Sequence, residues 1–323
     1  MNIWTNHDLE PEKLQWLRDQ LAPHTLVVAN STGTNLSVAA RDESCTKSDI
    51  AFGQPAVEDL LATNTLKWIH ITSAGFTRYD RADLRDALAA NQTTFTNSSS
   101  VYDDPCAQHV FAMMICHNRR FIQSLKSHEN HEWTYDALRP IERVLTGENV
   151  LIVGFGAIGV RLTELLAPFG CNVRGVRRTP NGDEAVPTFK ISDLESHLGW
   201  ADHVVNLLPA GPSTNKLFNE RVYSQFQPNT AFYNVGRGDT VDQEALASAL
   251  NNGKIAAAYL DVTSPEPLPS DHPLWSAKNC FITPHVAGGM QNEMDCLVDH
   301  FLENFKRFTA KEPLKDIVTT LGK

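Results

Sequence analysis

GFGAIG at residues 154–159 is the stretch of sequence that decides the fold of this chain. A short apolar run at 150–153 precedes it, and a segment whose apolar residues recur at helical spacing follows it at 160–167. A strand, a glycine turn and a helix in this order form the fingerprint of a dinucleotide-binding site. Gly154 permits the tight turn, Gly156 lets the backbone approach a pyrophosphate, and Gly159 lets the helix pack closely on the strand. An ordinary glycine turn between any strand and helix is the alternative interpretation.

Length and composition indicate a globular protein of about two domains. The chain has 323 residues, of which 42% are hydrophobic, so each domain can bury a core. The net charge of -10 disfavours nucleic acid and anionic membranes as partners. The N-terminus lacks the pattern of a signal peptide and no apolar run reaches the length of a membrane span, which predicts a cytoplasmic protein. None of the six cysteines forms a CxxC pair, so we expect reduced, mostly buried thiols.

Strands and helices alternate along the chain, which predicts parallel α/β sheets. Before the glycine turn we expect strands at 2–5, 26–29, 50–52, 66–72 and 93–96, and helices at 11–21 and 83–90. From Asn149 onward we expect strands at 150–153, 172–176, 203–208, 230–235, 256–262 and 280–283. Six strands are the count of a full doubly wound dinucleotide domain. A last amphipathic helix is expected at 289–309.

A largely apolar helix is expected to connect the two series of strands. The polar residues 97–100 are typical of a linker, and Asp103 or Asp104 would then cap the helix with Pro105 in its first turn. The helix would run to about Lys126. We therefore predict two domains. One is a Rossmann-type doubly wound parallel sheet at 103–289, and the other is a smaller, discontinuous, flavodoxin-like α/β domain made of 1–102 and 290–323.

Two other segments carry polar groups that could bind a ligand. The loop Ser73-Ala74-Gly75-Phe76 follows an expected strand, at the edge where open α/β sheets bind ligands. Its backbone amides could hold a small carboxylate, and an ordinary glycine turn is an equal alternative. His128 and His131 lack the HExxH spacing and a nearby third ligand, so we predict no metal site.

Three polar residues follow expected strands of the second series and would share the ligand edge of its sheet. Arg237 lies between two glycines, and its planar fork suits a carboxylate. Glu266 lies in a loop stiffened by prolines. His285 can donate and accept protons near neutral pH, and Glu266 nearby would stabilise its protonated form. Each residue alone would be interpreted as structural, whereas the set in this order predicts a catalytic site.

The motifs after the glycine turn resemble those of the D-isomer-specific 2-hydroxyacid dehydrogenases. Besides GFGAIG they are NLLPAGPST, NVGRGDTVDQEALASAL, AAAYLDVTSPEPLPSDHPLW and ITPHVAGG, and the resemblance covers about residues 73–289. It implies that Arg237 binds the carboxylate and keto oxygen of the substrate, that His285 is the acid and base, and that Glu266 holds His285.

The resemblance also implies the binding residues. The backbone of Ala74 and Gly75 matches the loop that holds the substrate carboxylate, Asp261 matches the nicotinamide-binding aspartate, and Pro209 matches a proline beside the cofactor. The expected substrate-binding set is Ser73, Ala74, Gly75, Arg237 and His285. The expected cofactor-binding set is Gly154, Phe155, Gly156, Ala157, Ile158, Gly159, Arg177, Arg178, Thr179, Leu208, Pro209, Val235, Gly236, Asp261 and Gly288. Phe76, Tyr102 and Trp133 are guesses for the lining of the substrate pocket.

We therefore predict an oxidoreductase that moves hydride between a nicotinamide cofactor and a small 2-keto or 2-hydroxy acid, in a cleft that closes to exclude water. By resemblance, reduction of glyoxylate or hydroxypyruvate is the leading activity. A homodimer built on the helix at 104–126 and the segment after it is the expected assembly. A dinucleotide-sensing, corepressor-like binding protein and a formate or phosphite dehydrogenase on the same fold are the alternatives.

One departure from the family concerns cofactor choice. The acidic residue usual at the end of the second strand is missing, and Arg177 occupies its place, followed by Arg178 and Thr179. An acid there binds both ribose hydroxyls of NAD and repels a 2′-phosphate, whereas guanidinium groups and a hydroxyl attract the phosphate. The sequence therefore predicts NADP(H) in preference to NAD(H). Alternatively, both arginines point into solvent and the site tolerates either cofactor.

Overall fold

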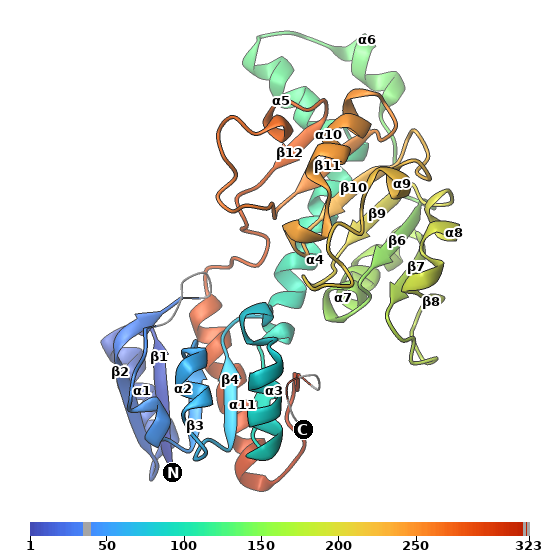
Figure 1. The fold of residues 1–323 in the computed structure, drawn as a ribbon. Coiled ribbons are helices and arrows are strands. Elements are labelled where there is room, and N and C mark those ends of the chain that lie inside the picture. Colours follow the sequence, from blue (N-terminus) through green and yellow to red (C-terminus); the bar gives the residue numbers. More distant parts are fainter. Residues whose placement is uncertain (35–39, 319–320, 322–323) are drawn as a thin grey trace. The chain divides into compact units, whose positions relative to one another are not determined.

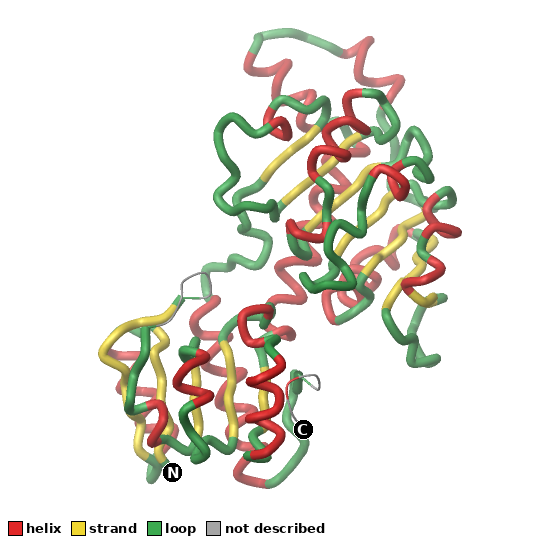
Figure 2. The backbone as a smooth tube through the Cα atoms, in the orientation of Figure 1, coloured by secondary structure: helices red, strands yellow, loops and turns green. Residues whose placement is uncertain are grey.

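The computed structural model describes residues 1–34, 40–318 and 321, which form two compact α/β units (Figure 1). Unit 1 consists of Met1–Tyr102 and Met290–Lys323, and unit 2 of Asp103–Gly289. Of the segment 290–323 that was assigned to the first domain, residues 319–320 and 322–323 lie outside the described residues. Strands and helices alternate in both units, as Figure 2 shows by colour, so the predicted fold class is confirmed.

Unit 1 contains a five-stranded parallel sheet in the order β2-β1-β3-β4-β5. This is the order of flavodoxin-like sheets, which the sequence predicted for this part of the chain. The strands lie where apolar runs were found, with ends that differ by a few residues. They are β1 (Asn2–His7), β2 (Thr25–Gly33), β3 (Ile50–Gly53), β4 (Trp68–Ile71) and β5 (Thr94–Thr96).

Helices cover both faces of the first sheet, because successive side chains of a strand point to opposite faces. Ala51 faces α2 (Val57–Leu61) and α3 (Ala82–Ala90), and Phe52 faces α1 (Pro11–Leu21) and α11 (Glu293–Ala310). Phe301 of α11 stacks on Phe52 at 4.1 Å and on Trp68 at 5.3 Å between ring centroids. The last long helix therefore completes the core of the first sheet, although α11 begins at Glu293 rather than at Gly289.

Unit 2 contains a seven-stranded parallel sheet in the order β12-β11-β10-β9-β6-β7-β8. The first six strands in chain order follow the 3-2-1-4-5-6 arrangement of dinucleotide-binding domains, and one strand is added at the far edge. The predicted count of six was wrong because β8 was missed. The strands are β6 (Asn149–Val153), β7 (Asn172–Arg177), β8 (Thr188–Lys190), β9 (His203–Asn206), β10 (Ala231–Asn234), β11 (Ala257–Leu260) and β12 (Cys280–Ile282).

Helices also cover both faces of the second sheet. Leu151 and Val153 of β6 face a core shared with α8, α9 and α10, whereas Ile152 lies against α7 on the other face. The helices of this unit are α5 (Phe121–Glu129), α6 (Tyr135–Leu138), α7 (Ala157–Leu166), α8 (Glu195–Leu198), α9 (Glu220–Tyr223) and α10 (Gln243–Asn251). Among the described residues, no helix has the length and hydropathy to cross a membrane.

The connecting helix, α4, spans Ser99–Asn118, which corrects both of its predicted ends. Pro105 lies inside the helix rather than in its first turn. The helix begins early because the carboxylate of Asp316 accepts hydrogen bonds from the amide and hydroxyl of Ser100. It ends before Lys126 because Arg120 adopts a left-handed conformation, with φ at 52°. The N-terminus of α4 is thus fixed by a residue that is far away in the sequence.

The cysteines are all free thiols, but fewer are buried than expected. Cys45 and Cys106 are buried, and the other four are only partly covered. Burial raises the pKa of Cys106 and of Cys280 to about 12.

Candidate active site

The glycine turn after β6 has the geometry that each glycine was predicted to provide. Gly154 has φ at +93°, and a Cβ there would lie 2.8 Å from the carbonyl carbon of Leu207. A Cβ on Gly159 would lie 3.0 Å from Phe155, so α7 packs closely on its strand. A Cβ on Gly156 would meet no atom closer than 3.9 Å. The space beside Gly156 is therefore open, as approach by a ligand requires.

Gly154 shares its close neighbour with Gly236. A Cβ on Gly236 would lie 2.6 Å from the carbonyl oxygen of Leu208 and 2.9 Å from the carbonyl carbon of Leu207. Both glycines follow strands that flank β9, so the backbone of Leu207–Leu208 runs between them. We call this arrangement the glycine floor. Pro209, which follows it, is exposed.

The N-terminus of α7 can hold a phosphate. Gly156 is its N-cap and no side chain caps the helix. Within the described residues, the amides of Ala157 and Ile158 donate to no protein acceptor. Free amides and the helix dipole together favour an anion at this end. A dinucleotide pyrophosphate therefore fits the residues present.

Arg177 ends β7, where the ribose of a dinucleotide is expected. Its Nη1 lies 3.3 Å from Oε1 of Glu184, an acid that the sequence analysis did not identify. The two oxygens of Glu184 also accept hydrogen bonds from the amides of Asn181, at 2.6 Å, and Gly182, at 2.9 Å. The hydrogen bond from Asn181 is the main cause that holds the pKa of Glu184 below its ordinary value.

The two arginines after β7 therefore differ. Arg178 and Thr179 are exposed, and Arg178 has no hydrogen-bond or ion-pair partner in the part of the chain that the structure describes. Arg177 is only partly exposed and already contacts an anion.

His285 and Glu266 form a direct pair. Nδ1 of His285 lies 2.7 Å from Oε2 of Glu266, and Oε1 of Glu266 accepts a hydrogen bond from the amide of Thr263 at 3.0 Å. Burial alone would raise the pKa of Glu266, but the hydrogen bonds from His285 and Thr263 outweigh it and hold that pKa below its ordinary value. An ionised carboxylate only accepts, so Nδ1 of His285 donates and Nε2 is left to meet a substrate.

Asp261 at the end of β11 holds the loop on which His285 lies. Its carboxylate accepts hydrogen bonds from the hydroxyl of Thr283 and from the amides of Val286 and Ala287, at 2.6, 2.9 and 2.9 Å. His285 itself has φ at 54°, which is uncommon for a residue with a side chain. Asp261 therefore fixes the backbone on both sides of a strained histidine, and its role toward nicotinamide stays a prediction.

Arg237 follows β10 and is held by two buried asparagines that the sequence analysis missed. Asn234 Nδ2 donates to the carbonyl oxygen of Arg237 at 3.2 Å, and Asn206 Nδ2 donates to Asn234 Oδ1 at 3.0 Å. Asn206 also donates to the hydroxyl of Thr240, which in turn donates to the Arg237 carbonyl at 2.6 Å. These contacts fix the backbone that carries the guanidinium.

The Arg237 side chain is left available for an anion. It has no ion-pair partner among the described residues, and its Nη1 donates only to the carbonyl of Gly236. Burial lowers the pKa of Arg237 from its ordinary value, against the opposing charge of Glu266. Of the remaining predicted residues in this unit, Val235 is buried and Gly288 is partly buried.

The predicted substrate loop, Ser73–Gly75, follows β4 in unit 1. Its carbonyl groups accept hydrogen bonds from Ser98, Asn97 and the Ser73 hydroxyl. Within the described ranges, the amides of Ala74 and Gly75 donate to no protein group. Free amides beside occupied carbonyls give this loop the polarity that a carboxylate needs.

The three guesses for the substrate pocket have different surroundings. Phe76 is partly buried in unit 1. The hydroxyl of Tyr102 donates to the carbonyl of Thr72 and lies 2.7 Å from the carboxylate of Glu293. Trp133 in unit 2 is 93% exposed.

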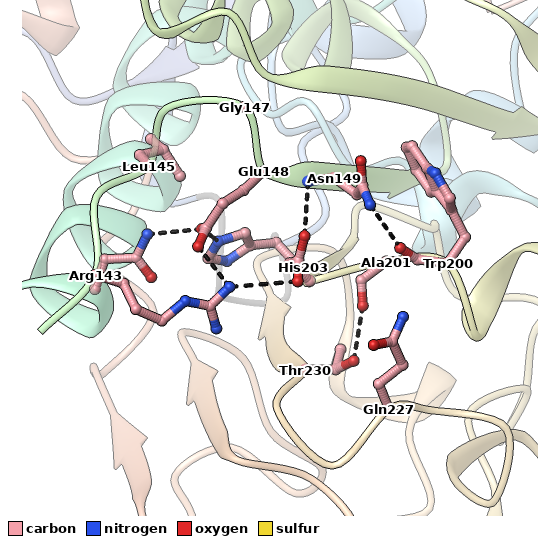
Figure 3. Close-up of polar contacts among 12 residues, drawn as sticks. Arg143, Leu145, Gly147, Glu148, Asn149, Trp200, Ala201, His203, Gln227 and Thr230 are labelled. Atoms are coloured by element: carbon pink, nitrogen blue, oxygen red, sulfur yellow. Dashed lines mark hydrogen bonds and ion pairs between the residues drawn. The ribbon is translucent and has the colours of Figure 1, made fainter. Parts of the chain in front are cut away.

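A second polar cluster lies at the opposite, amino edge of the second sheet. Glu148 lies between Arg143 and His203 (Figure 3). Its Oε1 is 2.5 Å from Nη2 of Arg143, and its Oε2 is 2.6 Å from Nε2 of His203. Asn118 at the end of α4 donates to the same carboxylate at 2.7 Å. Burial would raise the pKa of Glu148, but His203, Asn118 and Arg143 together hold it below its ordinary value. This cluster joins α4 to the starts of β6 and β9, far along each strand from the ligand edge.

Comparisons with known proteins agree with this geometry. The family model described as "D-isomer specific 2-hydroxyacid dehydrogenase, NAD binding domain" matches residues 111–287. Human glyoxylate reductase/hydroxypyruvate reductase is 35% identical over 189 residues, which cover 58% of each chain. Glyoxylate/hydroxypyruvate reductase B of Escherichia fergusonii is 29% identical over 296 residues, which cover 88% of this chain and 90% of the relative. A solved D-isomer specific 2-hydroxyacid dehydrogenase from Xanthobacter autotrophicus, in complex with NADPH and MES, has a TM-score of 0.80 at 25% identity and covers 99% of this chain and 98% of its own.

Proposed function

The chain belongs to the D-isomer-specific 2-hydroxyacid dehydrogenases, and from that premise we propose that it moves hydride between NADP(H) and a small 2-keto or 2-hydroxy acid. The observation that carries this proposal is the contact of 2.7 Å between His285 Nδ1 and Glu266 Oε2. It orients an imidazole at the ligand edge of a dinucleotide-binding sheet, with Arg237 on a neighbouring loop.

The three catalytic residues, Arg237, Glu266 and His285, then have distinct roles in the reaction. The nicotinamide, when bound, supplies or accepts the hydride. In the direction of reduction, Nε2 of His285 gives its proton to the oxygen that becomes the hydroxyl, and in oxidation it takes that proton back. Glu266 stabilises the protonated ring. Arg237 binds the carboxylate of the acid and stabilises the negative charge that develops on the keto oxygen.

Backbone amides in each unit can also bind an anion. In unit 1 the free amides of Ala74 and Gly75 would donate hydrogen bonds to the substrate carboxylate, and in unit 2 those of Ala157 and Ile158 would donate to the pyrophosphate. Leu208, Pro209, Val235 and Gly236 would line the cofactor. Gly236 and Leu208 belong to the glycine floor, where a Cβ on the glycine would collide with the backbone of Leu207–Leu208.

We further propose that the cofactor is NADP(H) in preference to NAD(H). Arg178 has a free guanidinium and Thr179 an exposed hydroxyl just after β7, and both can bind a 2′-phosphate. The Xanthobacter protein was solved with NADPH, which supports the same choice.

Glyoxylate and hydroxypyruvate are the proposed substrates, since the human and Escherichia fergusonii relatives are reductases of these acids by name. The test is the initial rate with a panel of 2-keto acids, each with NADH and with NADPH. The variant His285→Gln, purified in parallel, controls for contaminating reductases. Equal rates in the two preparations with every acid would contradict the proposal.

We also propose that the chain forms a homodimer through α4 and the segment after it. Large apolar side chains are exposed along that segment, among them Phe121, Leu125, Tyr135 and Ile141, each at least half exposed. A second copy of the chain would bury them, since an apolar patch of this kind marks a protein interface.

A further inference from the structure

The loop after β7 is folded around a carboxylate. Oε1 of Glu184 contacts Arg177, and its carboxylate accepts hydrogen bonds from the amides of Asn181 and Gly182. These contacts join the two ends of the loop at 177–184. The side chain of Glu184 is only 8% exposed, whereas its neighbour Asp183 is exposed. These contacts give Glu184 a fixed position next to the guanidinium.

The end of β7 is where a sheet of this kind distinguishes NAD from NADP. β7 is the second strand of the sheet in chain order, directly beside β6 and its glycine turn. In such sheets the end of the second strand meets the adenosine ribose, where NAD carries a 2′-hydroxyl and NADP a 2′-phosphate. Arg177 is therefore the positively charged residue at the end of this strand, and its Nη1 already contacts the carboxylate of Glu184.

A 2′-phosphate and the carboxylate of Glu184 would compete for the guanidinium of Arg177. Both are anions that bind a guanidinium, and they repel each other when they share it. A 2′-hydroxyl carries no charge and meets no such repulsion. Glu184 thus disfavours NADP without disfavouring NAD. The acidic residue that does this in NAD-binding sheets lies at the end of the second strand, whereas Glu184 lies in the loop that follows it.

We propose that Glu184 is a specificity-determining residue that competes with a 2′-phosphate for Arg177. In this arrangement Arg178 is the cation that is free for the phosphate, and Arg177 is available only in part. Glu184 limits the preference for NADP(H) and lets the protein bind NAD(H) as well. This inference rests on the proposed function and concerns the cofactor that the same site takes.

The test is equilibrium binding of each cofactor, without substrate, by fluorescence titration of NADPH and NADH. In Glu184→Gln the charge is lost and one amide oxygen remains to accept one of the two backbone amides, so a thermal unfolding midpoint close to that of the wild type is measured first to show that the variant is folded. We expect NADPH to bind about two- to fivefold more tightly, the range for an exposed ion pair, with NADH changed less than about twofold. Asp183→Asn removes the same charge one residue away, and there we expect the ratio of the two dissociation constants to stay as in the wild type.

A double-mutant cycle identifies the partner. In the Arg177→Ala background, Glu184→Gln should tighten NADPH less than it does in the wild-type background, because competition for the arginine is gone and only the direct repulsion between the two anions is relieved. An unchanged ratio in Glu184→Gln, weaker NADPH binding, or the same shift in Asp183→Asn would overturn the inference alone. Wild-type protein that binds neither dinucleotide would overturn the proposed function, and the inference with it.

Discussion

His285 directs one ring nitrogen at Glu266, 2.7 Å away, and this contact determines which nitrogen is left for chemistry. The backbone that follows His285 is fixed by the amides of Val286 and Ala287, which donate to the carboxylate of Asp261. A histidine that is fixed in this way exchanges its proton through Nε2 alone.

Replacing His285 by Gln should lower kcat by roughly 10²–10⁴, the usual contribution of acid–base catalysis. Cofactor binding should be retained, because among the described residues no hydrogen bond or ion pair joins His285 to the glycine turn or to α7. Steady-state rates together with the NADPH dissociation constant make the comparison. A kcat near that of the wild type would exclude His285 as the acid.

Glu266→Gln should change the pH profile rather than only the rate. The pKa of Glu266 is held below its ordinary value, so the wild-type carboxylate is ionised at neutral pH, and its charge is lost only as pH falls through that lowered pKa. Without the charge, the protonated form of His285 loses its partner. The alkaline limb of kcat/KM for reduction should then move to lower pH. Asp271→Asn, an exposed acid nearby, should leave the limb in place.

Replacing Arg177 and Arg178 together by alanine should raise KM for NADPH far more than KM for NADH. Each charge-assisted contact to a phosphate contributes on the order of 1.5–3 kcal/mol, less where it is exposed, and even the low end is about tenfold in affinity. The measurement is kcat/KM with each cofactor. A wild-type kcat/KM that is higher with NADH would show that the proposed preference is wrong.

The protein should have the mass of a dimer by light scattering at micromolar concentration. Leu125→Glu, which is 60% exposed on α5, should shift the mass toward the monomer, because a charge would be buried in the interface. Val28→Glu, on β2 of unit 1, is the control and should leave the dimer intact. A monomeric wild type would end this proposal.

Glu148→Gln should lower the free energy of unfolding by on the order of 3 kcal/mol at neutral pH, as expected when a buried charge pair loses one partner. The folded-state pKa of Glu148 lies below its ordinary value, so its contribution is present above the unfolded pKa and is lost as pH falls through the folded one. The difference between variant and wild type should therefore shrink below about pH 4. Urea unfolding at several pH values measures it, with Glu142→Gln, on a more exposed pair, as the control that changes it by less than about 1 kcal/mol.

Apolar periodicity was sufficient to predict most of both sheets, because a buried parallel strand needs a continuous apolar run. It failed at β8, whose three residues have a single large apolar side chain, Phe189, and pair only with 175–177 of β7. It also failed at the start of α4, where Asn97 accepts the amide of Ser99 but the amide of Ser100 is accepted by the distant Asp316. Long-range partners of this kind leave no local pattern.

The candidate site was likewise predicted only in part from the sequence. Arg237, Glu266 and His285 were found because each follows a strand inside a long motif. Asn206 and Asn234 were missed because an asparagine at a strand end is ordinary in a sequence, and only the register of β9 against β10 reveals that they bond to each other. Glu184 was missed because its contact with Arg177 depends on how the intervening loop turns.

The glycine floor also limits how this protein can diverge. Any side chain at Gly154 or Gly236 would collide with the backbone of Leu207–Leu208, so these positions tolerate no exchange whichever dinucleotide is bound. In the loop at 178–184, by contrast, a Cβ on Gly182 would have no atom within 4 Å, and Arg178 and Thr179 are exposed. A laboratory selection for altered cofactor use should therefore accumulate substitutions in the loop at 178–184 and none at Gly154 or Gly236.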